Sequence, residues 1–421
     1  MTFPLTFTSL ATLLMQVRGA WLRWLGRTHG AGMAKKKPLE WVNFLMAGRG
    51  EEQGTAPLPP IFPALTPARA WAMAGATAMS DSARDQRADH RKPTTFLMAG
   101  RGEEQGTAPL PPYHLPVLPA EVERWMDAKS GDVIIDGTLG GGGHTSLFLQ
   151  KGARVLGIDR DPEALAYAGK RLAAYRDALS TFQANYSQMS EHPNLPESGQ
   201  VQGILLDLGV SSHQLDCAER GFSFQKDGPL DMRMGPNAEM TAADFVNAAS
   251  EAEMVQVLRE FGEEPQARRI AHLITERRRK TPFTRTGDLA SCIESALGRH
   301  GRTHPATRTF QAIRMRINEE LSLLHDALEA AVRCLAPGGR LLVITFHSLE
   351  DRMVKQFLQH RAKPYIDDPT WPAPRDNPEY HLTLPVRKSI SAGSAELTSN
   401  PRARSAKLRV AVRNHRKLET P

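Results

Sequence analysis

The chain has 421 residues and a formal net charge of +7, from 53 Lys and Arg against 46 Asp and Glu. This length allows two domains, or one large domain with extensions, and the basic excess favours a polyanionic partner without indicating any particular fold. The three cysteines, Cys217, Cys292 and Cys334, are far apart and form no C-x-x-C pair, which argues against a disulfide framework or a zinc ribbon and fits a reducing cytoplasm.

The first 112 residues differ in composition from the rest. The segment FLMAGRGEEQGTAPLPP occurs at Phe44–Pro60 and again, unchanged, at Phe96–Pro112. Two copies are too few for a solenoid, so we interpret them as duplicated DNA, translated from a start placed too far upstream. The chain between the copies is rich in Ala, Pro and Arg without a sustained period, and we expect residues 1–112 to form a disordered extension. The apolar stretch Leu5–Leu25 contains two arginines, which argues against a signal peptide or a membrane span.

The segment that follows contains the pattern of a nucleotide-binding βαβ unit. Val133–Ile135 is an apolar run typical of a buried parallel strand, and it ends at Asp136. Five glycines follow within a short loop, then a predicted helix at Thr145–Lys151 and a second strand at Val155–Ile158 that stops at Asp159. Glycines let the backbone approach a ligand closely, and the acid at the tip of the second strand can accept hydrogen bonds from a ribose.

The spacing of the glycines distinguishes two cofactor classes. A dinucleotide fold needs G-x-G-x-x-G. Whether the motif starts at Gly140 or Gly141, its last glycine would have to stand where the sequence has Thr145 or Ser146. An acid immediately before the glycines instead suits S-adenosylmethionine (AdoMet), whose positively charged methionine part lies over such a loop. A glycine-rich turn in some other α/β domain is the structural alternative.

The remaining elements predict an α/β fold, with a mostly parallel sheet and helices on both faces. In chain order we expect helices at Ala120–Met126 and Glu163–Tyr175, strands at Thr181–Tyr186 and Gly203–Asp207, a crossover helix at Arg308–Leu335, a strand at Gly339–Phe346 and a last edge strand at Leu408–Val412. Ligands bind at the carboxyl ends of parallel strands. Asp136, Asp159, Tyr186, Asp207 and His347 all lie there, so we predict a single crevice.

The chain between the fourth and fifth strands is much longer than a crossover needs, and we place a small inserted helical domain at 215–307. The Rossmann-like domain would then comprise residues 113–214 and 308–421. Helix starts at Thr241 and at the capping box of Ser250 with Glu253 support the insertion. Further helices are expected at Arg268–Lys280 and Asp288–Leu297.

Two basic clusters are expected beside the crevice. We propose Arg277, Arg278 and Arg279 of the insertion, with Arg402 and Arg404 of the tail, as RNA-binding residues. The alternative is that the run is simply a solvated helix face.

Seven segments, in one order between about His114 and Arg413, carry a resemblance to a known family. They are DGTLGGGGHT at Asp136–Thr145, GIDRDP at Gly157–Pro162, GILLDLGVSSHQLDCAERGFSF at Gly203–Phe224, GPLDMRM at Gly228–Met234, HPATRTFQAIR at His304–Arg314, ITFHSLEDR at Ile344–Arg352 and NPRARS at Asn400–Ser405. Together they resemble the bacterial small-subunit ribosomal RNA cytosine-N4 methyltransferases (RsmH, formerly MraW). His213 departs from the pattern, because many members have proline there.

The resemblance implies a class I AdoMet-dependent methyltransferase fold that methylates the exocyclic N4 of a decoding-region cytidine in 16S rRNA of the 30S subunit. It also allows a homodimer. The sequence itself shows no cluster of metal ligands, so we expect no metal site. The cofactor residues it implies are Gly142, Gly143 and His144 for the methionine part, Asp159 for the ribose, Tyr186 for the adenine, and Asp207 and Gln214 to complete the site. Structural alternatives are a helix cap for His144, a core position for Tyr186 and a turn cap for Asp207.

Methyl transfer from a sulfonium is a single in-line displacement that depends on proximity and orientation. Because the cytosine N4 lone pair is delocalised into the ring, an acceptor for the amine hydrogens would localise it. Our catalytic candidates are Asp207, Asp231 and His347, with Ser211 or Ser212 as positioning groups.

Three other activities compete with this assignment. Methylation at cytosine C5 would need a cysteine nucleophile, and Cys217 lacks the Pro-Cys setting expected for one. The enzyme alternative is a methyltransferase acting on another amine, in DNA or protein. The non-enzyme alternative is an AdoMet- or nucleotide-binding RNA chaperone, which would bind 30S subunits without transferring a labelled methyl group.

Overall fold

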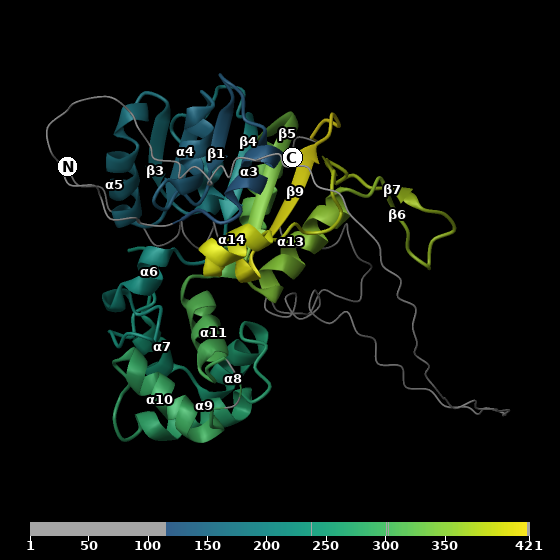
Figure 1. The fold of residues 1–421 in the computed structure, drawn as a ribbon. Coiled ribbons are helices and arrows are strands. Elements are labelled where there is room, and N and C mark those ends of the chain that lie inside the picture. Colours follow the sequence, from purple (N-terminus) through teal and green to yellow (C-terminus); the bar gives the residue numbers. More distant parts are fainter. Residues whose placement is uncertain (1–114, 237, 300, 302, 419–421) are drawn as a thin grey trace, which may run out of the picture. The chain divides into compact units, whose positions relative to one another are not determined.

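The computed structural model describes residues 115–418, except residues 237, 300 and 302, and its central feature is a seven-stranded sheet (Figure 1). The described residues belong to one compact unit, Ala108–Pro421. The predicted duplication and disorder of residues 1–112 lie outside the described residues. None of the described helices is long and apolar enough to cross a membrane.

The strand order of the sheet is β3-β2-β1-β4-β5-β9-β8. Its strands are β1 (Val133–Asp136), β2 (Arg154–Asp159), β3 (Leu179–Gln183), β4 (Val201–Asp207), β5 (Leu335–Thr345), β8 (Leu382–Thr383) and β9 (Lys407–Arg413). The first five strands are parallel, and β9 runs antiparallel to both β5 and β8. The predicted α/β class with a mostly parallel sheet is confirmed. A separate hairpin pairs β6 (Tyr365–Ile366) with β7 (Arg375–Asp376).

Helices cover both faces of the sheet. Alternate residues of each strand point to opposite faces, and the strands carry apolar residues on both, so both faces need to be covered. Ile135 and Leu206 pack toward α12 (Glu320–Cys334) and α13 (Ser348–Arg361). On the other face, neighbouring strand residues pack toward α3 and α4. The other helices of this part are α3 (Pro119–Met126), α4 (Gly143–Gln150), α5 (Pro162–Arg171), α14 (Ser394–Ser399) and the 3₁₀ turns η1 (Ala173–Tyr175), η2 (Tyr186–Glu191) and η4 (Pro401–Ser405).

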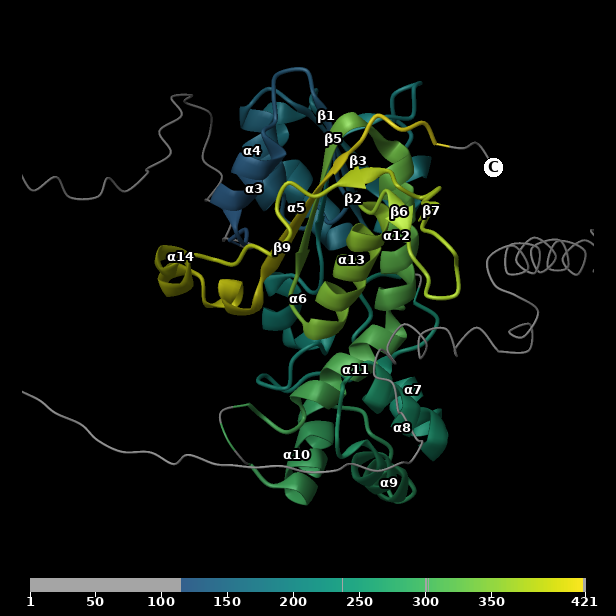
Figure 2. The same ribbon diagram turned by 90° about the vertical axis from the view of Figure 1, so that its right-hand side faces the viewer.

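A second group of helices packs around a hydrophobic cluster of its own. These helices are α7 (Ala242–Ala248), α8 (Glu251–Glu260), α9 (Ala267–Arg278), α10 (Thr286–Leu297) and α11 (Thr307–Ile317), preceded by α6 (Ser212–Asp216) and η3 (Ala218–Arg220). Phe245, Ile274 and Phe283 are buried in this cluster. Phe310 and Ile313 of α11 also belong to it, so α11 packs with the insertion although it lies beyond residue 307. Figure 2 shows α11 between the insertion helices and α12.

Three local predictions are wrong. The crossover at Arg308–Leu335 is two helices rather than one, because Glu319 has a left-handed φ of 52° that interrupts the path. Leu408–Val412 is not an edge strand, because β8 pairs along the outer side of β9. The strand predicted at Thr181–Tyr186 ends at Gln183, because Asn185 caps η2 through a capping box and leaves Tyr186 in that turn.

Candidate functional site

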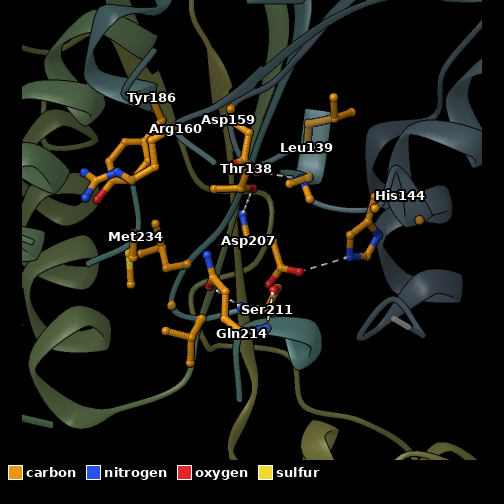
Figure 3. Close-up of a pocket in the computed structure, with 18 of the residues that line it drawn as sticks. Thr138, Leu139, His144, Asp159, Arg160, Tyr186, Asp207, Ser211, Gln214 and Met234 are labelled. Atoms are coloured by element: carbon orange, nitrogen blue, oxygen red, sulfur yellow. Dashed lines mark hydrogen bonds and ion pairs between the residues drawn. The ribbon is translucent and has the colours of Figure 1, made fainter. Parts of the chain in front are cut away.

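A pocket lies at the carboxyl ends of β1, β2 and β4, beneath the glycine loop (Figure 3). Its lining includes Gly137–Gly141, Gly143 and His144 after β1, Asp159 and Arg160 after β2, Ala184 and Tyr186 after β3, Asp207–Ser211 after β4, and Pro116, Ala164, Gln214, Met234 and Phe346. All the residues predicted to bind the cofactor line this pocket except Gly142.

Asp136 is not part of the pocket lining; its side chain supports the glycine loop through hydrogen bonds. Its buried carboxylate accepts hydrogen bonds from the Thr145 hydroxyl at 2.7 Å and from the Thr138 amide at 3.2 Å. Burial raises the pKa of this carboxyl, against the lowering effect of the Thr145 hydrogen bond. The acid that precedes the glycines therefore ties the loop to the start of α4.

Gly142 has a structural role at the start of α4. Its φ of 72° is left-handed, and a Cβ atom built there would lie 2.6 Å from Cδ1 of Leu172. Only glycine fits this turn without a shift of Leu172. Gly142 therefore sets the direction of α4, whose first residues, Gly143 and His144, do line the pocket.

Asp159 is engaged by the protein as well as facing the pocket. Its two carboxylate oxygens accept hydrogen bonds from the amides of Gly140 at 2.8 Å and Asp161 at 2.9 Å. Burial raises the pKa of the Asp159 carboxyl to about 6, against the lowering effect of these two hydrogen bonds. Since a carboxylate has about four lone-pair sites, each oxygen can still accept a ribose hydroxyl.

His144 and Asp207 point toward each other in the wall of the pocket (Figure 3). Nε2 of His144 lies 3.5 Å from Oδ2 of Asp207. Among the described residues, neither ring nitrogen of His144 nor Oδ1 of Asp207 has a hydrogen-bond partner, although all three atoms are buried. Buried polar groups without partners are uncommon and costly. These atoms therefore point to a polar ligand in the pocket.

Tyr186 and Gln214 border the pocket from two other elements. The Tyr186 hydroxyl donates to the backbone oxygen of Glu320 at 3.4 Å, and burial raises its pKa. Gln214 forms a capping box with Ser211 at the start of α6, and its amide donates to Oδ2 of Asp161 at 3.0 Å. Both side chains are thus held in place by the protein.

The three catalytic candidates are not brought together. Asp207 lines the pocket, whereas Asp231 lies outside the lining and forms two 2.8 Å hydrogen bonds with the Arg233 guanidinium. His347 also lies outside the lining; it caps α13, and its Nε2 is 3.0 Å from Oε1 of Glu350. Of the serines proposed as positioning groups, Ser211 does line the pocket.

The proposed RNA-binding arginines differ in their contacts. Arg277 holds both carboxylate oxygens of Asp288 at 2.8 Å, and Arg278 donates to the backbone oxygen of Val246 at 2.7 Å. Arg279 is exposed and pairs with Glu276, one helical turn away. In the tail, Arg402 pairs with Asp216 at 3.0 Å, and Arg404 is exposed. Arg277 and Arg278 thus have structural partners within the insertion.

Sequence reasoning missed two pocket residues that interact across the fold. Arg160 follows Asp159 directly, and its guanidinium lies 3.4 Å from the backbone oxygen of Asn318. Met234 belongs to the insertion, and its amide donates to Oδ1 of Asn318 at 2.9 Å. Arg160 lies in the motif GIDRDP and Met234 in the motif GPLDMRM. No sequence pattern indicated that Asn318, between α11 and α12, would contact both residues.

The pocket fits AdoMet. The unpartnered atoms of His144 and Asp207 suit the amino-acid end of that cofactor, and Asp159 suits its ribose. Gly137 lets this loop pack closely on the core, because a Cβ atom there would lie 2.6 Å from Cδ2 of Leu206 and 3.2 Å from Cβ of Tyr186. The residues present therefore match the amino-acid end and the ribose of the cofactor.

The sheet order, the glycine loop after β1 and the acid at the tip of β2 define a class I AdoMet-dependent methyltransferase. The chain belongs to the MraW methylase family, whose model matches residues 112–414.

Similar curated proteins carry one name, Ribosomal RNA small subunit methyltransferase H. The protein from Heliobacterium modesticaldum is 45% identical over 71% of this chain and 98% of its own length. Those from Rhizorhabdus wittichii and Caulobacter vibrioides are each 50% identical over 71% of this chain, and over 93% and 95% of their own lengths. Among solved structures, an rRNA methylase from Streptococcus thermophilus aligns with a TM-score of 0.32 and 9% identity, over 70% of this chain and 94% of that one.

Proposed function

We propose that this enzyme transfers a methyl group from AdoMet to the exocyclic N4 of a cytidine in the decoding region of 16S rRNA, within the 30S subunit. The observation that carries the proposal is the pocket with its unpartnered His144 and Asp207 atoms, in a chain of the MraW family whose relatives are named as small-subunit rRNA methyltransferases. Family resemblance supplies the choice of base and nitrogen.

The residues of the chain would act mainly by positioning. AdoMet supplies a methyl group on a sulfonium, which is open to attack by a nitrogen lone pair. Asp207 and His144 would hold the amino-acid end, Asp159 would accept hydrogen bonds from the ribose, and Tyr186 would form a wall for the adenine. Fixing the methyl donor against the amine converts an encounter into an oriented, effectively unimolecular reaction.

Transfer of a labelled methyl group to undermethylated 30S subunits tests the proposal. We expect label in 16S rRNA, in the N4-methylcytidine fraction after nucleoside digestion. Label in DNA or protein but not in 16S rRNA would favour the alternative amine methyltransferase. Binding of 30S subunits without label transfer would favour an RNA chaperone. Sedimentation equilibrium tests the homodimer that the family resemblance allows.

A further inference from the structure

A second, smaller cavity adjoins the cofactor pocket. The two share Arg160, Tyr186, Leu208, Gly209 and Met234 in their linings. The second cavity is completed by Glu320, Leu324 and Glu350. It therefore lies beside the loop after β4. Its lining combines the apolar side chains of Leu208, Met234 and Leu324 with two carboxylates.

Both carboxylates are buried, and each lies against a basic side chain. Glu320 is 7% exposed, and its two oxygens accept hydrogen bonds from Arg314 at 2.7 and 2.8 Å. Glu350 is 2% exposed; Oε1 lies 3.0 Å from Nε2 of His347, and Oε2 accepts from the Phe346 amide at 3.0 Å. Burial works to raise the pKa of Glu350, but the hydrogen bond and charge of His347 and the charge of Arg314 lower it overall. Glu350 therefore remains an anion.

Glu350 has unused capacity to accept hydrogen bonds. A carboxylate offers about four lone-pair sites, and the described contacts use two of them. The carboxylate is thus a charged acceptor at the edge of a cavity that continues into the methyl-donor pocket. An N–H donor is the natural partner for such a group.

On this basis, and resting on the function proposed above, we propose that the second cavity receives the target base, with Glu350 accepting a hydrogen bond from its exocyclic amine. Leu208 and Met234 supply apolar contact for the ring, and Arg160 supplies a donor for a ring nitrogen or carbonyl oxygen. His347 is a positioning residue that holds Glu350. A base with a carbonyl oxygen in place of the amine would place two hydrogen-bond acceptors against each other and be rejected.

A divalent cation is the competing occupant. Ligand atoms of Glu320, His347 and Glu350 all lie within 4.8 Å of one another. However, Arg314 already engages both oxygens of Glu320, and its own positive charge opposes a bound cation. The contacts therefore favour an amine over a metal ion.

The test compares Glu350→Gln with Asp351→Asn, the next residue of α13. A glutamine keeps the size of Glu350 and can still accept from the Phe346 amide, but it loses the charge. Asp351 is also paired, with Lys407 at 3.2 Å and Arg409 at 2.7 Å, but it does not line either cavity. Methyl transfer to 30S subunits, AdoMet affinity by calorimetry and the melting temperature are measured for both.

We expect Glu350→Gln to lower kcat roughly 10- to 100-fold, the worth of a hydrogen bond to a charged group, with AdoMet affinity nearly unchanged. Asp351→Asn should keep kcat. Leu324→Phe, which narrows the second cavity alone, should also lower methyl transfer more than AdoMet affinity. A purely structural role for Glu350 would instead lower the melting temperature and AdoMet affinity together.

The outcomes separate the two proposals. If the unaltered protein transfers no label to 30S subunits, the proposed function fails. If it does transfer label but Glu350→Gln matches Asp351→Asn in kcat, only the base-binding inference fails. Binding of one equivalent of Mn²⁺ or Zn²⁺ by the unaltered protein, lost in Glu350→Gln, would also overturn it in favour of a metal site.

Discussion

The two carboxylate oxygens of Asp159 have two roles. They hold the backbone amides of Gly140 and Asp161, and they also line the pocket with lone pairs to spare. The first contact fixes the glycine loop to the tip of β2. The second would offer acceptors to the ribose that we propose for this site. We therefore expect loop geometry and cofactor affinity to be linked through this side chain.

Replacing Asp159 with alanine should weaken AdoMet binding and also lower the melting temperature. Loss of charge-assisted hydrogen bonds to the ribose should cost about 1.5–3 kcal/mol of binding free energy. The amides of Gly140 and Asp161 also lose their acceptor, which explains the thermal effect. Calorimetry and thermal unfolding measure the two changes, and an unchanged AdoMet affinity would remove Asp159 from the ribose site.

AdoMet affinity of the unaltered protein should increase as pH rises from 5 to 7. The pKa of Asp159 is raised to about 6 in the cofactor-free protein. Above that pH the carboxylate is charged and is the better acceptor for ribose hydroxyls; below it, binding must first remove a proton. Titration calorimetry at several pH values should show this trend, and Asp159→Ala should flatten it. Equal slopes in the two proteins would assign the pH dependence to another group.

The residue types of the site could be predicted from sequence, but their partners could not. Asp159 and Asp207 were identifiable because acids at the tips of parallel strands share one edge of the sheet. The double engagement of Asp159 was not visible, because it depends on the path of the glycine loop back to the strand tip. Glu350 was missed because its motif, ITFHSLEDR, shows a helix start but not which acid turns toward the cavity.

At the scale of elements, the basic residues at the end of α9, Arg277 to Lys280, lie in two different environments. Arg277 bonds both oxygens of Asp288, and its guanidinium lies 4.8 Å from the centre of the Phe283 ring. Arg279 and Lys280, at the end of the same run, are exposed. A sequence shows only the run of charges, whereas the direction of each side chain around the helix end decides which arginine stabilises the insertion.

Substitutions along this run should therefore divide into two classes. Arg277→Ala should destabilise the protein by about 1 kcal/mol, since its ion pair is partly exposed and adds a cation–π contact. Neutralising Arg279 and Lys280 together should leave the melting temperature unchanged but flatten the salt dependence of 30S binding. Thermal unfolding and binding at several salt concentrations measure both. A salt slope unaffected by the double substitution would favour a solvated helix face.

The break between α11 and α12 is a feature that the periodicity of apolar residues does not predict. Both halves are amphipathic, so the sequence predicted one continuous crossover. Asn318 ends α11, and its amide donates to the backbone oxygen of Met232 at 2.8 Å and accepts from the Met234 amide. These are long-range contacts, and no local propensity specifies them. The break places Met234 of the insertion beside the cofactor pocket.

At the scale of the whole molecule, polar contacts join the insertion to the sheet domain on two sides. Arg220 pairs with Asp161 at 2.8 Å, near the cofactor pocket. Glu263 accepts hydrogen bonds from the Ser348 hydroxyl at 2.6 Å and from Arg352 at 2.8 Å, at the start of α13. Both contacts lie within the compact unit Ala108–Pro421. Within the described residues, the site thus draws on both groups of helices.

A truncated protein beginning at Met98 should fold, bind AdoMet and methylate 30S subunits like the full chain. It retains all of Ala108–Pro421 and the whole family match, 112–414. A further truncation beginning at Asp132 is the control, because it removes α3, where Val122 is fully buried against the sheet. Losing that helix exposes part of the core, and burial of one such side chain is worth about 1.5–3 kcal/mol. The shorter protein should therefore melt at a markedly lower temperature. If the Met98 truncation instead lost AdoMet binding or melted much earlier than the full chain, residues before Met98 would be part of the fold.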